Sequence, residues 1–265
     1  MTSRPPAVAG SFYPARPRAL EKALTSAFEA ADPPPAELDP SQVKALIVPH
    51  AGYVYSGSTA ASGYALLRDR TIEMIVLLGP THRVGIRGMA LPGCDLFETP
   101  LGEVTVDAEL AKAAAAVPMV VTRPDVHEYE HSLEVQLPFL QTVCPQASVL
   151  PVAVGSATPA EVGALLNALW GGPETIVIIS SDMSHFHRYE EARRIDAGTI
   201  DQILAFDDSV QPEQACGCHP MDGLLHVAAA HELHPALLAA RNSGDTAGDR
   251  ARVVGYASFA FQEAS

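Results

Sequence analysis

Four stretches of the chain are nearly continuous runs of Val, Ile and Leu, and they constrain the fold more than any other feature. A strand with one face in water alternates apolar and polar residues, whereas a strand buried on both faces does not. The runs therefore predict a sheet that is covered on both sides. They are 44–50, 72–80, 148–155 and 175–182, with a further strand expected at 251–262 and a β-rich stretch at 89–107.

Segments with helical periodicity lie between these strands, so the crossovers between parallel strands are expected to be helices. They are 17–31, 58–69, 108–117, 132–143, 159–170, 188–205 and 221–231. A chain of 265 residues that is 48% hydrophobic and 18% charged can bury one large core. We therefore expect one domain over 1–265, an α/β sandwich with a buried mixed, largely parallel sheet. The linker-like piece 31–42 is expected to be a surface connection.

The charge and the first residues of the chain limit its partners and its location. The formal net charge is −14, and no run of Lys or Arg offers a surface for nucleic acid or for an anionic membrane. The first 17 residues lack the apolar core of a signal peptide, and no apolar run reaches about 18 residues. We expect a cytoplasmic protein without nucleic-acid or membrane partners, whose four cysteines are thiols or metal ligands rather than disulfides.

Polar side chains follow three of the buried strands at the point where each strand ends. His50 follows the first, His82 the second, and Asp182 and His185 the one at 175–182. In open α/β sheets the ligand crevice lies outside the carboxyl ends of the strands. One such histidine is usually a hydrogen-bonded structural residue, but three at strand exits predict a common site.

The segment EYEHSLEVQLPF carries Glu130, His131 and Glu134 at the expected start of a helix. Ser132 is suited to cap that helix, and the acidic groups suit the positive end of its dipole. The alternative is that the two carboxylates and the imidazole form one wall of the site.

The segment ACGCHP carries Cys216 and Cys218, two residues apart. This spacing differs from the C-x-x-C of zinc knuckles, and no second cysteine pair completes a structural zinc site. A thiolate from this loop can still join ligands from distant strands. Two imidazoles and one anionic ligand leave open positions on a divalent ion, as in catalytic zinc and non-haem ferrous sites. His185 would then transfer protons, with Asp182 orienting its ring.

The sequence lacks G-x-S-x-G, P-loop and G-x-G-x-x-G motifs, so nothing in it supports a hydrolase triad, an NTPase or a dinucleotide enzyme. Six ordered segments, however, resemble the Memo family over nearly the whole chain. They are RPPAVAGSFYP, VPHAGYVYSG, LLGPTHR, EHSLEVQLPFL, SSDMSH and CGCHP. The resemblance implies the fold of class III extradiol dioxygenases, non-haem iron enzymes that open catechol rings.

The resemblance also implies roles for individual residues. His50 and His82 match the metal-binding histidines of the family, and Cys216 matches a cysteine that stands where the dioxygenases have a glutamate ligand. His185 matches the acid/base histidine, and Asp182 the acid of the SSD motif. The resemblance makes Fe²⁺ the first expectation. A thiolate makes the site softer, which leaves Cu⁺ or Zn²⁺ as alternatives. Related prokaryotic proteins accompany an AMMECR-type and a radical-SAM protein, which implies a shared pathway.

Three functions follow as hypotheses. The first is a redox enzyme of the extradiol-dioxygenase type acting on an unknown small aromatic substrate. The second is a metal- or peptide-binding adaptor without turnover, and the third is a zinc-dependent hydrolase with Glu130 or Glu134 as base. Tyr53 and Tyr55, in the expected turn after His50, either line the pocket or are structural. Cys218 is a surface thiol, an alternate ligand or a redox partner of Cys216.

Overall fold

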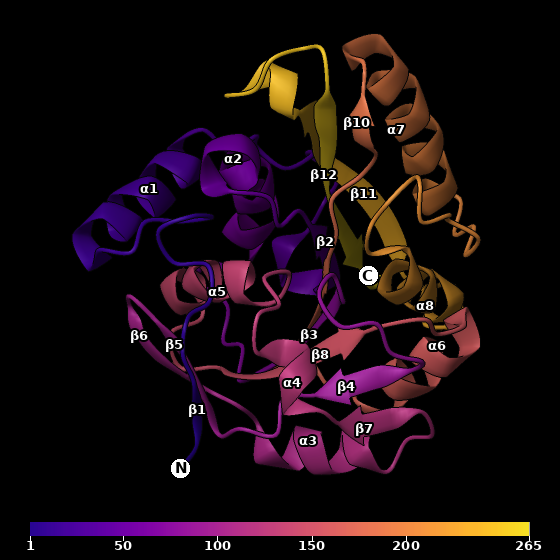
Figure 1. Cartoon of the computed structure of the whole chain (residues 1–265). Coiled ribbons are helices and arrows are strands. Elements are labelled where there is room, and N and C mark those ends of the chain that lie inside the picture. Colours follow the sequence, from indigo (N-terminus) through magenta and orange to yellow (C-terminus); the bar gives the residue numbers. More distant parts are fainter. Residues whose placement is uncertain (265) are drawn as a thin grey trace.

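The computed structural model describes residues 1–264 and places a mixed β-sheet between layers of helices (Figure 1). The helices are α1 (Pro17–Glu29), α2 (Tyr53–Tyr64), α3 (Ala108–Ala115), α4 (Pro124–His127), α5 (Leu137–Val143), α6 (Pro159–Ala168), α7 (Tyr189–Leu204) and α8 (Cys218–Ala228), with 3₁₀ turns η1 (Pro40–Gln42), η2 (Ala65–Leu67), η3 (Glu134–Gln136) and η4 (Ser243–Asp245). The strands are β1 (Ser3–Arg4), β2 (Val43–Val48), β3 (Met74–Pro80), β4 (Met89–Leu91), β5 (Leu96–Thr99), β6 (Gly102–Thr105), β7 (Val120–Thr122), β8 (Ser148–Val154), β9 (Thr175–Ser180), β10 (His185–His187), β11 (His234–Asn242) and β12 (Val253–Gln262).

The four apolar runs form the centre of the sheet, as predicted. The strand order is β10-β12-β2-β9-β3-β8-β4-β7, with β11 paired to the other side of β12. Strands β2, β9, β3 and β8 run parallel to one another, whereas β12 is antiparallel to β2. All residues of β2 and β9 are buried. Each buried Val, Ile or Leu side chain stabilises the fold by about 1.5–3 kcal/mol, so this order places the most apolar strands where both faces are covered.

Helices cover both faces of the sheet. Helices α1, α2 and α5 lie on one side of it, and α6, α7 and α8 on the other (Figure 1). Local signals explain where several helices begin: the side chain of Asp107 accepts a hydrogen bond from the N–H of Leu110 in α3, and Thr158 and Glu161 form a capping box at α6. The α/β sandwich predicted from the sequence is therefore confirmed.

Some element boundaries differ from the prediction. Helix α2 begins at Tyr53, directly after Gly52, so Tyr53 and Tyr55 lie on a helix and not in a turn. The predicted helix 132–143 is a 3₁₀ turn followed by the short α5, with Pro138 in its first turn. The prediction that Ser132 caps this helix is wrong, because its hydroxyl donates to the carbonyl oxygen of Pro80.

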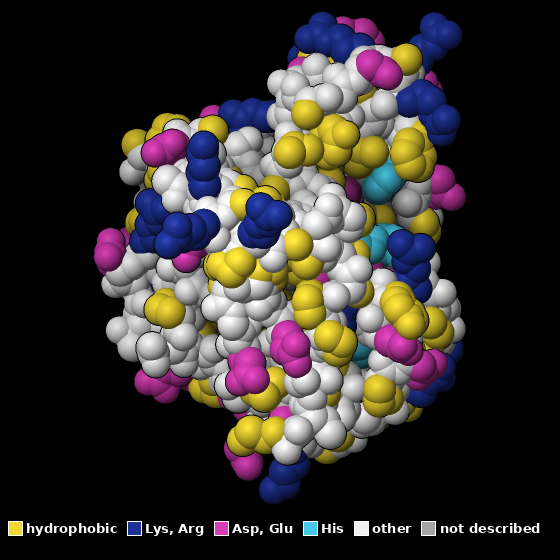
Figure 2. All heavy atoms as spheres, turned by 60° about the vertical axis from the view of Figure 1, so that its left-hand side comes forward, with side chains coloured by type: hydrophobic (Ala, Val, Ile, Leu, Met, Phe, Trp, Pro, Cys, Tyr) yellow, Lys and Arg dark blue, Asp and Glu magenta, His cyan; other side chains and the backbone are white. Residues whose placement is uncertain are grey.

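No helix within residues 1–264 has both the length and the apolar character needed to cross a membrane. Positive and negative side chains are interspersed over the face shown in Figure 2, and Lys and Arg do not gather there into one patch.

Candidate metal centre

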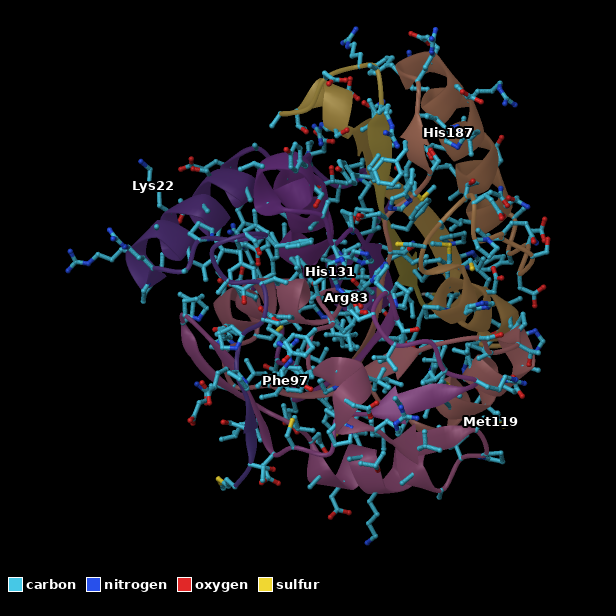
Figure 3. All side chains as sticks on the ribbon, in the orientation of Figure 1. Lys22, Arg83, Phe97, Met119, His131 and His187 are labelled. Atoms are coloured by element: carbon cyan, nitrogen blue, oxygen red, sulfur yellow. The ribbon has the colours of Figure 1, made fainter. Side chains whose placement is uncertain are left out.

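Three histidines meet at the carboxyl edge of the sheet. His50 follows β2, His82 follows β3, and His131 comes from the loop between α4 and η3. One ligand atom from each lies within 4.8 Å of the others. Strand β9 separates β2 from β3 in the sheet, so the two strand-end histidines flank Asp182 and His185, which follow β9. Figure 3 shows His131 near the middle of the molecule.

The hydrogen bonds of Ser180 determine which nitrogen of His50 is free. Ser180 Oγ lies 2.9 Å from His50 Nδ1, donates to the carbonyl oxygen of Ser132 at 2.7 Å, and accepts from Gln136 Nε2 at 2.8 Å. A hydroxyl has only one proton to donate, so Nδ1 of His50 must donate to Ser180. Burial, together with the nearby His131 and His82, holds the pKa of His50 well below its usual value. The ring is therefore neutral, and its Nε2 lone pair is free to bind a metal ion.

Glu130 orients the other two histidines. Its Oε1 lies 2.9 Å from His82 Nδ1 and 3.2 Å from His131 Nδ1, and accepts the backbone N–H groups of His131 and Ser132. Burial opposes ionisation of Glu130, but the hydrogen bonds from His131 and His82 outweigh it and hold the pKa of this carboxyl below its usual value. A carboxylate on the far nitrogen of a ligating histidine fixes the ring and raises its basicity. Glu130 therefore supports the ring of His82 by a hydrogen bond and lies at ion-pair distance from the ring of His131.

Cys216 contacts the cluster from the loop before α8. Its Sγ lies 3.3 Å from His50 Nε2 and 3.8 Å from the carbonyl oxygen of Asp182. Burial, followed by the charge of Asp182, raises the pKa of the Cys216 thiol. The thiol can donate to the lone pair of His50 Nε2 or to the carbonyl oxygen of Asp182, and in either case its sulfur lies beside the nitrogen that would bind a metal ion.

Asp182 and His185 connect the cluster to a cavity. Asp182 Oδ1 accepts the backbone N–H groups of His50 and Ala51, at 2.8 and 3.2 Å. Burial raises the pKa of Asp182 and lowers that of His185. Both residues line a cavity of about 690 Å³, as does Tyr55. Within residues 1–264 no hydrogen bond joins the two side chains, so Asp182 orients the backbone of His50 rather than the ring of His185.

The donor atoms fit a transition metal. Imidazole nitrogen suits zinc, iron and copper, whereas a thiol beside it favours zinc, copper(I) or thiolate-bound iron. Three imidazoles, of which those of His50 and His82 are fixed by hydrogen bonds at Nδ1, satisfy the ligand count of a catalytic site that keeps an open position. The side chains therefore can hold one metal ion at His50, His82 and His131, and the set does not select between these metals.

Comparison with known proteins identifies the family. The model of the family described as "Memo-like protein" matches residues 4–260. The chain therefore belongs to the Memo family. A MEMO1 family protein of Archaeoglobus fulgidus is 40% identical over an alignment of 277 positions, which covers 98% of this chain and 99% of that protein. MEMO1 family proteins of Methanosarcina acetivorans and Aquifex aeolicus are 40% and 36% identical, and each match covers at least 97% of both chains.

Glu134, predicted as part of the pocket wall, instead anchors the N-terminal segment of this Memo-family protein. It is completely buried and forms an ion pair with Arg4. Its carboxylate also accepts the backbone N–H groups of Ala7 and Val8 and the hydroxyl of Tyr13, at 2.8, 3.0 and 2.6 Å. All its acceptor positions are therefore used, and it has no free lone pair for a substrate.

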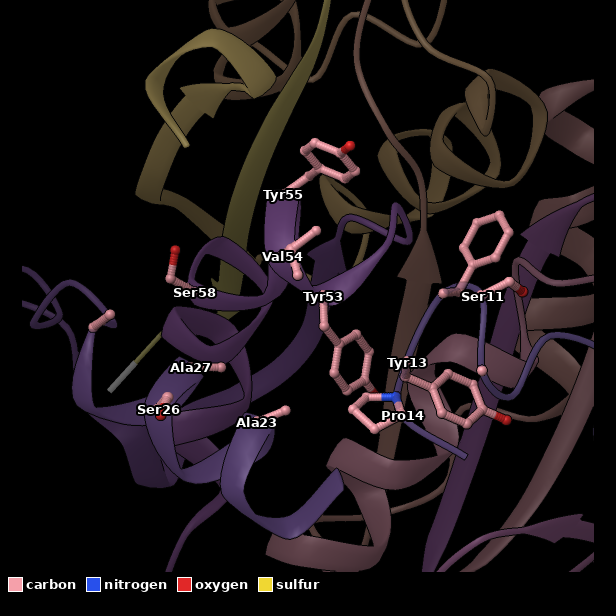
Figure 4. A pocket seen from close by; sticks show the side chains of 13 residues that line it. Ser11, Tyr13, Pro14, Ala23, Ser26, Ala27, Tyr53, Val54, Tyr55 and Ser58 are labelled. Atoms are coloured by element: carbon pink, nitrogen blue, oxygen red, sulfur yellow. The ribbon is translucent and has the colours of Figure 1, made fainter. Parts of the chain in front are cut away.

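The positions of Tyr53 and Cys218 decide between alternatives that the sequence left open. Tyr53 lies in the core, where its hydroxyl donates to the carbonyl oxygen of Val135. In Figure 4 its ring points toward Tyr13 while that of Tyr55 points away. Cys218 is 2% exposed at the start of α8, so it is not a surface thiol, and both it and Cys216 are free.

The grouping of His131 with His50 and His82 was missed in the sequence. His131 had been assigned to the pocket wall, and Cys216 to the third ligand position. The only signal was that His131 stands in the same segment as Glu130, a carboxylate that could support a ligating histidine. His131 does not follow a strand, so strand ends could not reveal it.

Proposed function

We propose that this protein is a metal-dependent redox enzyme of the extradiol-dioxygenase type, acting on a small aromatic substrate. The observation that carries the proposal is the meeting of His50, His82 and His131 in one cluster, while Ala51, next to His50, and Asp182, hydrogen-bonded to it, line a cavity together with His185. A bound ferrous ion would supply the open coordination positions at which a catechol-type substrate and dioxygen are brought together. Copper(I) and zinc are the alternatives that the donor set allows.

The residues of the chain have separate roles in this proposal. His50 and His82 hold the ion through Nε2, with Ser180 and Glu130 fixing the rings. His131 completes the set, and Cys216 is the alternative third ligand because its sulfur lies beside His50 Nε2. His185, whose lowered pKa leaves it neutral near pH 7, accepts a proton from a substrate hydroxyl in the cavity.

The structure disfavours the hydrolase hypothesis. That hypothesis needs Glu130 or Glu134 as a base toward a metal-bound water. Glu130 binds His82, His131 and the backbone of Ser132, and Glu134 binds the N-terminal segment. Neither carboxylate is free to accept a proton from water. The adaptor hypothesis remains the alternative for a protein that binds metal without turnover.

Metal analysis tests the proposal first. The protein would be purified without oxygen and without a histidine tag, and its metal content compared with that of His50→Ala, His82→Ala, His131→Ala and Cys216→Ala. We expect about one iron per chain, lost in the three histidine variants and kept in His234→Ala, an exposed control at the start of β11. A metal content that is the same in the histidine variants as in wild type would overturn the ligand assignment.

Activity is tested next by oxygen uptake with catechols. We expect uptake by the iron-loaded wild type and none by His185→Ala that has kept its iron. Full iron loading without uptake on any catechol would favour the adaptor. Zinc in place of iron, with hydrolysis, would favour the third hypothesis.

We also place the protein in the cytoplasm, where its free thiols would stay reduced. AMMECR-type and radical-SAM proteins are the proposed pathway partners, and this rests on the family resemblance alone.

A further inference from the structure

A second cavity, of about 360 Å³, lies where α6 and α8 begin, and these two helices are side by side in Figure 1. Asp222 of α8 lines it, together with residues 156–159 at the start of α6 and the segment 208–212. It shares no lining residue with the cavity that contains His185, and none of its lining residues belongs to the proposed metal centre. A ligand bound here would therefore be distinct from the proposed aromatic substrate.

Asp222 brings a buried carboxyl group to the wall of this cavity. The residue is 6% exposed, and its Oδ1 accepts the N–H of Val210 at 3.1 Å. Within residues 1–264 no hydrogen bond and no ion pair reaches its Oδ2. Burial raises the pKa of this carboxyl to about 7, because the negative charge has no cation beside it. A buried acid that is left without a partner costs stability, and such groups are typical of binding sites.

Close contact between α6 and α8 fixes the position of this carboxyl group. A Cβ atom on Gly223 would lie 2.2 Å from Val162 Cγ1, so the two backbones approach as closely as only a glycine allows. Asp222 directly precedes Gly223, so its backbone cannot move away from the cavity without breaking this contact. The carboxyl group therefore stays at the cavity wall, as expected of a ligand site that is already formed.

The groups around Asp222 favour a positively charged ligand. Arg87, which also lines the cavity, already pairs with Glu161. Asp208, whose side chain is 39% exposed at the rim, pairs with His226. The charged and titratable groups that surround Asp222 are Cys218, His219 and His226 on α8, Asp207 and Asp208 before it, and Arg87 and Glu161 beside α6. An anion would meet the repulsion of these acids, whereas a cation would relieve it.

The donor atoms in this wall are too far apart for three of them to hold one metal ion. Within residues 1–264, the group of three whose ligand atoms lie within 4.8 Å of one another is His50, His82 and His131, and Asp222 belongs to no such group. An ammonium ion needs only one carboxylate and can donate its other protons to further oxygens or to water. The cavity also offers apolar contacts for a short carbon chain, from Ala157, Pro159, Val210 and Pro212.

We propose that this cavity binds a small aliphatic amine whose ammonium group pairs with Asp222. The ammonium donates to Asp222 Oδ2, and the carbon chain lies along the apolar part of the wall toward the rim. A second ammonium at the other end would face Asp208, so the site prefers a diamine to a monoamine. This site goes beyond the proposed function, and its test does not depend on whether the metal centre is correctly assigned.

Calorimetry with matched ligands tests the site. 1,4-Diaminobutane, 4-amino-1-butanol and 1,4-butanediol would be titrated at pH 8, at about 0.15 M salt to screen the acidic surface, into wild type, Asp222→Asn and Asp201→Asn. Asp201→Asn is the control because Asp201 is exposed on α7, and Asp222→Asn should fold because it can still accept the N–H of Val210. We expect wild type and Asp201→Asn to bind the diamine at least about tenfold more tightly than the diol, and Asp222→Asn to lose this preference. Equal binding of diamine and diol by wild type, or an unchanged preference in Asp222→Asn, would overturn the site.

The pH dependence separates Asp222 from the acids of the surface. Because the pKa of its carboxyl is about 7 without ligand, wild type should bind the diamine about tenfold more weakly at pH 6 than at pH 8. Histidines also change charge in this range, so Asp222→Asn, which keeps His219 and His226, is the reference. The same pH effect in both proteins would overturn the role of Asp222.

Two further ligands test the chemical class. Tighter binding of Nα-acetyl-lysine amide than of 1,4-diaminobutane would overturn the assignment to a free amine and point to a lysine side chain of another protein. Binding of inorganic phosphate that becomes tighter in Asp222→Asn would overturn the assignment to a cation.

Discussion

Ser180 Oγ lies 2.9 Å from His50 Nδ1 while its only proton is donated to the carbonyl oxygen of Ser132, so the serine can only accept from the imidazole. This relationship fixes the tautomer of a buried ring and directs its Nε2 lone pair away from the sheet. The last residue of β9 thereby prepares the histidine at the end of β2 for metal binding.

Replacing this serine should weaken metal binding without removing a ligand. In Ser180→Ala, His50 loses its acceptor and Gln136 Nε2 loses one of its two acceptors. We expect metal affinity to fall about 10- to 100-fold and the free energy of unfolding to fall by about 1–3 kcal/mol. Competition with a metal chelator and denaturant unfolding measure the two effects. Ser258→Ala is the control, because Ser258 is fully buried but its hydroxyl has no hydrogen-bond partner within residues 1–264. Unchanged affinity in Ser180→Ala would contradict the assigned tautomer.

The charge of Glu130 should matter for metal affinity. Glu130→Gln keeps the shape of the side chain but cannot accept equally from both His82 and His131. We expect a loss of affinity of about 10- to 100-fold, with a visible change in the absorption spectrum of the Co²⁺-substituted protein as the two rings reorient. Glu161→Gln is a control, because this glutamate pairs with Arg87 at the surface. Equal affinity in wild type and Glu130→Gln would show that Glu130 does not support the ligands.

The sequence allowed the centre of the sheet and part of the site to be predicted, for a physical reason. Strands buried on both faces are recognisable from their apolar runs alone, and their carboxyl ends place His50 and His82 together. Strand β11 was missed, because its sequence HPALLAARN is rich in Ala and contains a Pro, and it becomes a strand only by pairing with β12. Glu134 was predicted to lie in the site, because nothing near it in the sequence points to its actual partner, Arg4, which lies 130 residues earlier in the chain. Such long-range pairs leave no local signal.

The ion pair of Glu134 with Arg4 should be far more important for stability than the ion pairs at the surface. Glu134→Ala leaves a buried guanidinium without its counter-ion, which costs about 3–5 kcal/mol in the free energy of unfolding. Asp125→Ala breaks an exposed pair with Arg123 that water screens, so it should change the stability far less. Phe12 belongs to the anchored segment, and its ring centroid lies 4.6 Å from that of His131. Glu134→Ala should therefore also disturb the metal site. A loss of stability as small as that of Asp125→Ala would contradict the anchoring role.

Asp222 should make the protein less stable as the pH rises. It is 6% exposed beside a cavity of about 360 Å³, and burial, with the charges of Asp208 and Asp207, raises the pKa of its carboxyl to about 7. The unfolded chain has the ordinary value of 3.8, so between pH 3.8 and 7 the folded protein binds more protons than the unfolded one. The free energy of unfolding therefore falls as the pH rises through this window.

Replacement of Asp222 by asparagine should remove this pH dependence. The side-chain oxygen of Asp222→Asn can still accept the N–H of Val210, which lies 3.1 Å from Asp222 Oδ1. Because the neighbouring cavity lets water partly solvate the carboxylate, we expect a gain on the order of 1 kcal/mol at pH 8, or about 2–4 °C in Tm, and a clearly smaller gain at pH 5. This gain is measured by thermal unfolding at both pH values of wild type, Asp222→Asn and the exposed control Asp201→Asn. A gain for Asp222→Asn that is the same at pH 5 and pH 8 would show that ionisation of Asp222 is not its cause.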